Sequence, residues 1–191
     1  MNQLLELAGF ITGVAGVWLT IRRHILCFPV GIVNVAISAW LFYGQKLYAD
    51  VLQQLVYFAL LAYGWHQWKR GRRHNNITPT SRLDAKGLAL LVLCIASSTF
   101  LLGSLLHHFT DAVLPWADSF ATSTAFAAQF LVARRKTENW ILWLIVNLSY
   151  ILIYLQRELP LYTLLFAIYF IMAIAGLHSW TRSSPSNDNG E

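Results

Sequence analysis

The chain carries little charge for its length. Only 12% of its 191 residues are Asp, Glu, Lys or Arg, whereas 57% are hydrophobic, and the mean hydropathy is +0.50. A soluble domain normally carries about 25% charged residues. The sequence therefore lacks the polar surface that keeps a globular fold in water, and lipid is the solvent that its composition suits.

Cysteine is scarce, and the motifs of common enzymes are absent. The two cysteines, Cys27 and Cys94, lie inside apolar segments without CxxC spacing, which argues against a disulfide framework or a metal site. The sequence has no HExxH or GxSxG motif, and no paired intramembrane acids suited to hydrolysis or proton pumping. We therefore expect no enzyme activity, no metal and no cofactor.

The net charge of +5 does not indicate nucleic-acid binding. The basic residues form short clusters at the ends of apolar runs, which is the pattern of membrane topology. The first run, Leu4–Ile21, follows an acidic leader and ends at Arg22 and Arg23 without a small-residue cleavage site. We expect it to be a membrane span and not a cleaved signal.

Seven apolar runs approach the length of a transmembrane helix, which needs about 17–25 mostly apolar residues. The fifth is the weakest, because residues 121–125 are only mildly apolar and Gln129 lies within it. Small residues are expected where helices pack closely in lipid, although this run could instead lie on the membrane surface. The expected spans are Leu4–Ile21, Ile25–Tyr43, Leu47–Trp68, Gly87–Leu106, Ala117–Ala133, Trp140–Leu155 and Leu161–Trp180.

Seven spans place nearly all of the basic residues on one side of the membrane. Twelve of the fourteen Lys and Arg residues fall on that side, and only Lys46 and Arg157 fall on the other. An excess of Lys and Arg marks the cytoplasmic side. The N-terminus is therefore expected outside the cell and the C-terminus in the cytoplasm.

The sequence also contains an internal repeat. Aligning Asn34 with Asn147, at an offset of 113, places the basic turn of the first half over that of the second, and small shifts align Gly64-x-His66-x-Trp68 with Gly176-x-His178-x-Trp180. Chance similarity between apolar helices is the alternative. We predict an all-α membrane protein in a 3+1+3 parallel-repeat (SWEET-like) arrangement, in which two bundles rock around a central site. Its parts are a first repeat (1–68), a cytoplasmic loop (69–86), a linker helix (87–106), a second repeat (107–182) and a cytoplasmic tail (183–191).

A stripe of aromatic and amide side chains marks the sixth run. Trp140, Trp143, Asn147, Tyr150 and Tyr154 follow helical spacing and share one face. Such a surface suits a flat, polar and possibly cationic ring, through stacking and cation–π contacts. The alternatives are that Trp140 belongs to the interfacial aromatic belt and that Asn147 bonds a neighbouring helix.

Further polar residues lie within the apolar runs. Polar groups are costly inside a membrane, so we expect each of them to have a structural or functional role. Asn34 occupies the middle of the second run at a position that the repeat matches to Asn147. Gln54 is followed three residues later by Tyr57 on the same face of the third run, and Gln129 lies in the fifth. We expect these residues to bind substrate together with Trp143, Asn147, Tyr150 and Trp140.

Two histidines raise alternative functions. His66 and His178 are equivalent in the repeat, as the axial haem ligands of a membrane oxidoreductase subunit could be. Both lie near the cytoplasmic ends of their runs, where histidines without a ligand role are commoner. A sugar carrier is a third hypothesis, based on the SWEET-like repeat.

The WxxWxxxN pattern of residues 139–147 closely resembles the PnuC family of bacterial vitamin transporters. The resemblance extends over nearly the whole chain, and includes residues 48–54 with Tyr63-Gly64-Trp65 and residues 115–119. It implies a seven-span, SWEET-like fold, a homotrimer, the bacterial inner membrane, and facilitated diffusion of nicotinamide riboside. It also implies that a cytosolic kinase traps the solute by phosphorylation.

The chain departs from the family at two positions that bear on the substrate. In our alignment, nicotinamide-riboside carriers have asparagine just ahead of the Tyr-Gly-Trp motif and again ahead of the matching later glycine. This chain has Leu61 and Ala175 there. Since lost hydrogen bonds change specificity strongly, and related proteins carry thiamin and riboflavin, thiamin is the alternative substrate.

Overall fold

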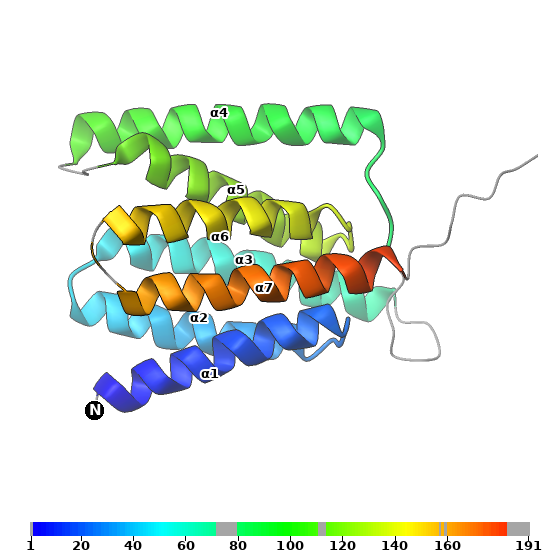
Figure 1. Cartoon of the computed structure of the whole chain (residues 1–191), viewed down its shortest axis with the longest axis horizontal. Helices are drawn as coiled ribbons and strands as arrows, with labels where there is room; N and C mark the ends of the chain where they lie inside the picture. The colour runs from blue at the N-terminus through cyan, green and yellow to red at the C-terminus, as the bar shows by residue number, and fades with distance from the viewer. Residues whose placement is uncertain (1, 72–79, 111–113, 157, 159, 183–191) are drawn as a thin grey trace, which may run out of the picture. The chain divides into compact units, whose positions relative to one another are not determined.

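The computed structural model describes residues 2–71, 80–110, 114–156, 158 and 160–182. These residues form seven helices, and within the same described part of the chain the only β-type pairing is an isolated bridge between Ser81 and Lys136. The predicted all-helical fold is confirmed, and helix ends lie within three residues of the expected runs. The helices are α1 (Asn2–Ile21), α2 (Cys27–Gly44), α3 (Tyr48–Arg70), α4 (Ala85–Phe109), α5 (Pro115–Ala133), α6 (Asn139–Gln156) and α7 (Pro160–Thr181) (Figure 1).

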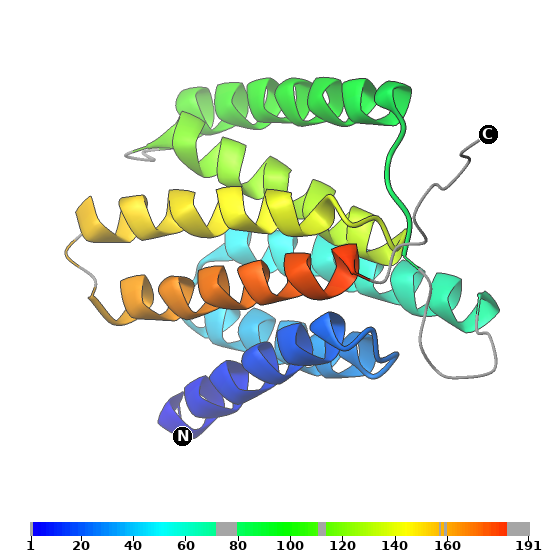
Figure 2. The same cartoon turned by 45° about the vertical axis from the view of Figure 1, so that its right-hand side comes forward.

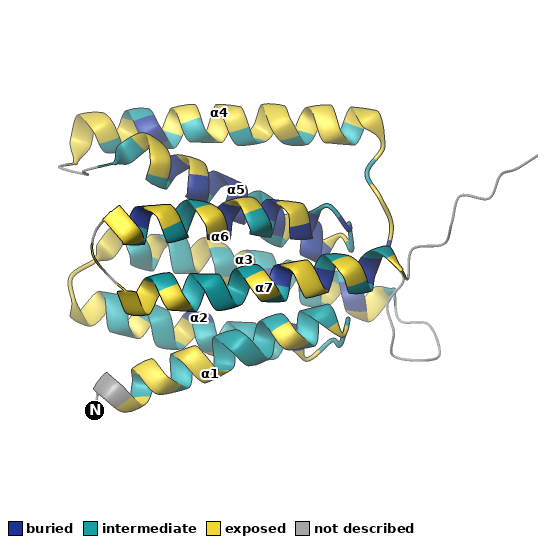
Figure 3. Cartoon of the chain, in the orientation of Figure 1, coloured by how far each residue is buried: buried dark blue, intermediate teal, exposed yellow. Residues whose placement is uncertain are grey.

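Five of these helices, α1, α2, α4, α6 and α7, are long and apolar enough to cross a membrane. The other two, α3 and α5, have 23 and 19 residues but lower hydropathy, because α3 carries charged ends and three glutamines and α5 carries hydroxyl groups. Much of α4 is exposed along its length, including its large apolar side chains (Figure 3). Exposure of such a helix suits contact with lipid.

The described helices form two compact units, which we treat separately. The first contains α1, α2 and α3 together with Val132–Arg135 at the end of α5, and the second contains α4, the rest of α5, α6 and α7. Within the first unit α2 packs on both α1 and α3, and within the second α6 packs on α7, as both views show (Figures 1 and 2). The expected repeat boundaries stay a prediction, and residues 72–79 of the expected loop and the expected tail 183–191 lie outside the described residues.

The turns that end α1 and α5 have the same backbone geometry. Arg23 and Arg135 both have positive φ, at 56° and 59°. The amide of Arg23 bonds the carbonyl of Thr20 and that of His24 bonds Leu19, and the same two bonds recur after α5. This is the Schellman pattern, which satisfies the last carbonyls of a helix. Lys46 and Glu158 take the same conformation after α2 and α6.

A close contact between a glycine and an aromatic ring also occurs once in each unit. In the first unit Gly64 of α3 lies against Phe28 of α2, and Phe28 meets Trp68 edge-to-face at 5.0 Å. In the second unit Gly176 of α7 lies against Trp140 of α6, which meets Trp180 edge-to-face at 5.6 Å. A residue without a side chain lets the two helices of each pair approach over the ring.

All of these features recur in a single register, which we call the structural register and define by the pairing of Arg23 with Arg135. The starts of α2 and α6 fall in the same register. The sequence alignment, which matched Asn34 with Asn147, uses an offset that is one residue larger than the offset of the structural register. The structural register instead pairs Asn147 with Val35, and Asn34 with Val146. The two asparagines are therefore not equivalent, because a shift of one residue turns a side chain by about 100° around a helix.

Gly176→Ala tests the aromatic contact. A methyl group at this position would lie 2.5 Å from the ring of Trp140, which is only 1% exposed and has no room to move. We expect a loss of about 1–3 kcal/mol of stability, as for other overpacked sites. Gly44→Ala is the matched control, since nothing lies within 4 Å of an added Cβ there. Thermal unfolding in detergent measures both, and equal midpoints for the two variants would contradict the expectation.

Candidate functional site

The aromatic stripe of α6 makes contact with different helices along its length. Trp140 is buried against Gly176 and Trp180 of α7, so it is not an exposed interfacial residue. Its indole nitrogen is buried and has no hydrogen-bond partner. Trp140 therefore holds α6 against α7 and keeps almost no exposed surface.

Trp143 lies one turn further along α6 and is only partly buried. It packs against a small cluster formed by Ala128 and Leu131 of α5 and Leu142 of α6. These contacts hold one part of the indole in place. The remaining exposed part is available for stacking against a ligand.

Tyr150 and Tyr154 continue the stripe further along α6. Their rings stack at 5.9 Å, and Tyr150 lies 4.8 Å from Phe166 of α7. Tyr154 also stacks on Tyr162 at 5.2 Å. The aromatic groups therefore form a continuous layer between α6 and α7 in which Tyr150 is half-buried.

Asn147 is the polar group at the centre of this stripe. Its side chain is 4% exposed, and no hydrogen bond is recorded between its amide and any described residue. A buried amide without a partner is costly, by about 1–3 kcal/mol. The proposed alternative, a bond from Asn147 to a neighbouring helix, is thus not seen within the second unit.

Helix α5, whose small residues are expected to pack against other helices, also carries buried hydroxyl groups. Ser119, Ser123 and Thr124 are at most 4% exposed, and their oxygen atoms have no hydrogen-bond partner. Ser119 and Ser123 are four residues apart and so share a face of the helix. That spacing was readable from the sequence. Gln129, further along α5, is half-buried.

Asn34 has a different environment in the first unit. Its amide donates hydrogen bonds to the carbonyl of Gly9, at 2.6 Å, and to the hydroxyl of Thr12, at 3.1 Å. Asn34 therefore ties α2 to α1. In the structural register, Thr12 corresponds to Thr124 and Asn34 corresponds to Val146, which explains why the hydroxyl of Thr124 has no such partner.

The remaining predicted positions of the first unit lie on α3. Gln54 and Tyr57 are both half-buried and three residues apart, as expected for one face. Leu61, where family carriers have an amide in our alignment, is buried and would contact a methyl group added at Gly31. In the second unit the other changed position, Ala175, is exposed.

The histidines of the haem hypothesis are exposed on their helices. His66 lies near the end of α3 and His178 near the end of α7. Among the residues that the structure describes, no group of three or more His, Cys, Asp or Glu side chains could hold a metal ion. No observation in either unit favours the haem hypothesis over substrate binding.

Long apolar helices that bury an amide, hydroxyl groups and indoles are typical of a multi-pass membrane protein. The profile of the family described as "Nicotinamide mononucleotide transporter" matches residues 3–182. The chain therefore belongs to this family.

Individual relatives agree with the family assignment. The chain is 25% identical to the nicotinamide riboside transporter PnuC of Escherichia coli, over 94% of this chain and 86% of that one. It is 28% identical to the PnuC of Neisseria mucosa, over 90% and 70% of the two chains. It is also 24% identical to the riboflavin/roseoflavin transporter RibM of Streptomyces davaonensis, over 92% and 83%.

A solved structure shares the fold. The crystal structure of the vitamin B3 transporter PnuC matches with a TM-score of 0.77, at 24% identity, and covers 94% of this chain and 81% of that one. The predicted resemblance to the PnuC family is confirmed. The chain is thus a multi-pass membrane protein of a bacterial transporter family.

The two asparagines should respond differently to substitution by leucine. Asn34→Leu removes two hydrogen bonds between α2 and α1, and we expect a loss of about 0.6–1.7 kcal/mol of stability. Asn147→Leu removes no recorded bond and buries an apolar group of similar size, so stability should be unchanged or higher. Thermal unfolding in detergent compares them, and greater destabilisation by Asn147→Leu would show that Asn147 is the structural residue.

Proposed function

We propose that this protein carries nicotinamide riboside across the bacterial inner membrane by facilitated diffusion. The relatives named as nicotinamide riboside transporters support this substrate. The observation that carries the proposal is the pairing of Trp143 with Asn147 on α6, where a partly exposed indole lies one turn from a buried amide without a recorded partner. The indole offers its face to a flat cationic ring, and the amide offers a donor and an acceptor to a carboxamide or ribose.

The proposed substrate contacts extend from this pair. In the second unit they include Gln129, with the hydroxyl groups of Ser119 and Ser123 on α5. Tyr150 contributes ring surface while it packs on α7, and Trp140 stays a predicted contact, although its burial against α7 favours a packing role. In the first unit, Gln54 and Tyr57 on α3 are proposed as polar contacts. Asn34 is still a predicted substrate contact, although its hydrogen bonds to α1 favour a structural role.

We further propose that the chain is a duplicated bundle of the 3+1+3 type with seven spans. The recurrence of turns, helix starts and glycine–aromatic contacts in one structural register supports this duplication. Under this proposal α3 and α5 also cross the membrane, and their lower hydropathy follows from the polar groups that they supply. The distribution of Lys and Arg supports an outside N-terminus and a cytoplasmic C-terminus.

The proposed mechanism needs no energy source of its own. The two repeats rock to expose the site alternately to each side, and the solute moves down its gradient. Phosphorylation of the solute by a cytosolic kinase adds charge that prevents its return through an apolar bundle. The resemblance to the family supports this coupling and the assembly of three chains.

Uptake by right-side-out vesicles tests the site. We expect saturable uptake of labelled nicotinamide riboside when no ion gradient is imposed and no ATP is supplied. Trp143→Ala and Asn147→Leu should each reduce it by about tenfold or more, since each removes a contact of roughly 1–3 kcal/mol. Gly44→Ala, a control that adds a methyl group where nothing lies within 4 Å, should transport normally. Normal uptake by both site variants at equal expression would remove Trp143 and Asn147 from the site.

Competition distinguishes the candidate substrates. Excess unlabelled nicotinamide riboside should block the labelled uptake, and thiamin should compete more weakly because it shares the flat cation but not the carboxamide. Stronger competition by thiamin would identify a thiamin carrier, as the loss of amides at Leu61 and Ala175 allows. Competition by glucose but by neither vitamin would favour the sugar-carrier hypothesis.

A further inference from the structure

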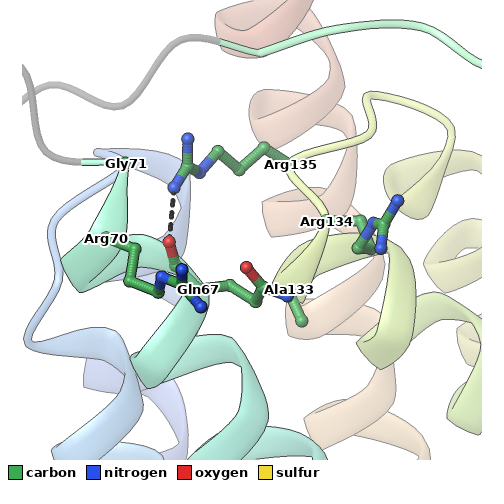
Figure 4. A pocket seen from close by; sticks show the side chains of 6 residues that line it. All are labelled: Gln67, Arg70, Gly71, Ala133, Arg134 and Arg135. Carbon is green, nitrogen blue, oxygen red and sulfur yellow. Dashed lines mark hydrogen bonds between the residues drawn. The ribbon is translucent and has the colours of Figure 1, made fainter.

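A cavity of about 320 Å³ lies within the first unit, among residues that the candidate substrate site does not use (Figure 4). It is formed where the end of α3 meets the end of α5 and the turn that follows. The indole nitrogen of Trp68 on α3 donates to the carbonyl of Val132, at 3.2 Å, which holds these two ends together. The lining residues are Gln67, Arg70, Gly71, Ala133, Arg134 and Arg135.

The cavity is strongly basic and has no acidic side chain to balance it. Three of the six lining residues are arginines, and no ion pair to any described residue is recorded for them. The sequence contains no Asp or Glu between Asp50, in the first turn of α3, and Asp84. Three guanidinium groups without a counter-charge in such a cavity favour an anionic ligand.

Arg135 is held in place and partly desolvated. Its Nη2 donates to the carbonyl of Gln67 at 2.8 Å, and Figure 4 shows the side chain reaching across to that atom. Burial lowers the pKa of Arg135, because the charged form has lost solvent without gaining a counter-ion. Four of its five N–H donors are not used by this bond.

Gly71 makes the room that Arg135 occupies. A Cβ atom at this position would overlap both terminal nitrogens of the Arg135 side chain. The φ angle of Gly71 is −92°, which any residue adopts. Glycine is therefore needed here because it has no side chain, and not because of its backbone conformation. A second arginine of the cavity, Arg70, has no recorded hydrogen bond, whereas Arg134 donates to the hydroxyl of Tyr63 at 3.3 Å. Arg70 and Arg135 are therefore the two groups best placed to receive a ligand.

We propose that this cavity binds a phosphate group through the planar forks of Arg70 and Arg135. Guanidinium groups bind phosphate oxygens bidentately, with geometry that an ammonium group does not offer. This inference rests on the proposed function, in which α3 and α5 cross the membrane, because the cavity then lies at the end of two spans, the level at which lipid headgroups present phosphodiesters. Soluble phosphate esters present the same chemistry from the water, and the experiment separates the two sources. The volume is at the small end for ligand pockets, which suits a headgroup.

The test uses the full chain in detergent and native mass spectrometry. The probes are phosphatidylglycerol, phosphatidylcholine, which has the same phosphodiester without net charge, and glycerol phosphate. We expect phosphatidylglycerol to bind in preference to phosphatidylcholine. Arg70→Gln should weaken this binding by about tenfold, since a charge-assisted hydrogen bond contributes roughly 1.5–3 kcal/mol. Gly71→Ala should weaken it to a similar degree, because it displaces the Arg135 guanidinium without removing charge.

Arg22→Gln is the matched control for charge. Arg22 belongs to the same unit and to another basic turn, where its guanidinium lies 5.2 Å from the ring of Trp18 and outside the cavity. This variant should bind phosphatidylglycerol as the unmodified chain does. Thermal unfolding checks each variant, and Arg70→Gln should fold normally because its guanidinium makes no recorded bond. If Gly71→Ala unfolds, the proposal is tested by comparing the phosphatidylglycerol binding of Arg70→Gln with that of Arg22→Gln.

The outcomes separate the possible sources of phosphate. Binding of phosphatidylglycerol but not of glycerol phosphate, lost in Arg70→Gln, supports a lipid site. Binding of glycerol phosphate with the same sensitivity supports a phosphate site filled from solution. Equal weakening by Arg22→Gln and Arg70→Gln would reduce the effect to general surface charge and overturn the proposal, as would the absence of binding by either anionic probe.

Discussion

The absence of water inside a bilayer governs how this chain uses its polar residues. Backbone groups are satisfied within the helices, so a polar side chain bonds another helix, bonds a carbonyl of its own helix as Thr12 and Ser149 do, or is left for a solute. Asn34 does the first, through Gly9 and Thr12 on α1. Asn147 on α6 is buried and has no recorded bond, and under the proposed function it binds the solute.

The structural register shows how the two units differ at this point. In the first unit the two residues at this point are Asn34 and Val35. The corresponding two residues of the second unit are Val146 and Asn147. The amide of the second unit lies one residue later and points about 100° away around the helix. Thr124, which corresponds to Thr12, consequently lacks the bond that Thr12 receives, and its hydroxyl is buried without a partner. Under the proposed duplication, this exchange makes the two halves unlike, as a substrate without symmetry needs.

Much of the fold could be predicted from the sequence, because long apolar runs with basic ends have one stable form in lipid. All seven helices were expected to within three residues at their ends. The turns and the glycine–aromatic contacts recur at an offset one residue smaller than that of the sequence alignment, which relied on matching two asparagines. Positive φ at Arg23 and Arg135 has no sequence signal, because glycine is the usual residue in that conformation.

The roles of individual site residues were harder to predict, because spacing gives a face of a helix but not the neighbour that covers it. Trp140 and Trp143 share a face of α6, yet the first is covered by Gly176 and Trp180 and the second is only partly covered, by side chains of α5. The covering residue is a glycine in one case and alanine or leucine in the other. An indole pressed on glycine loses its exposed surface, whereas one packed on larger side chains keeps an open edge. Burial therefore assigns α6–α7 packing to Trp140 and leaves Trp143, one turn from Asn147, as the indole of the two that keeps exposed surface for the proposed contact with a solute.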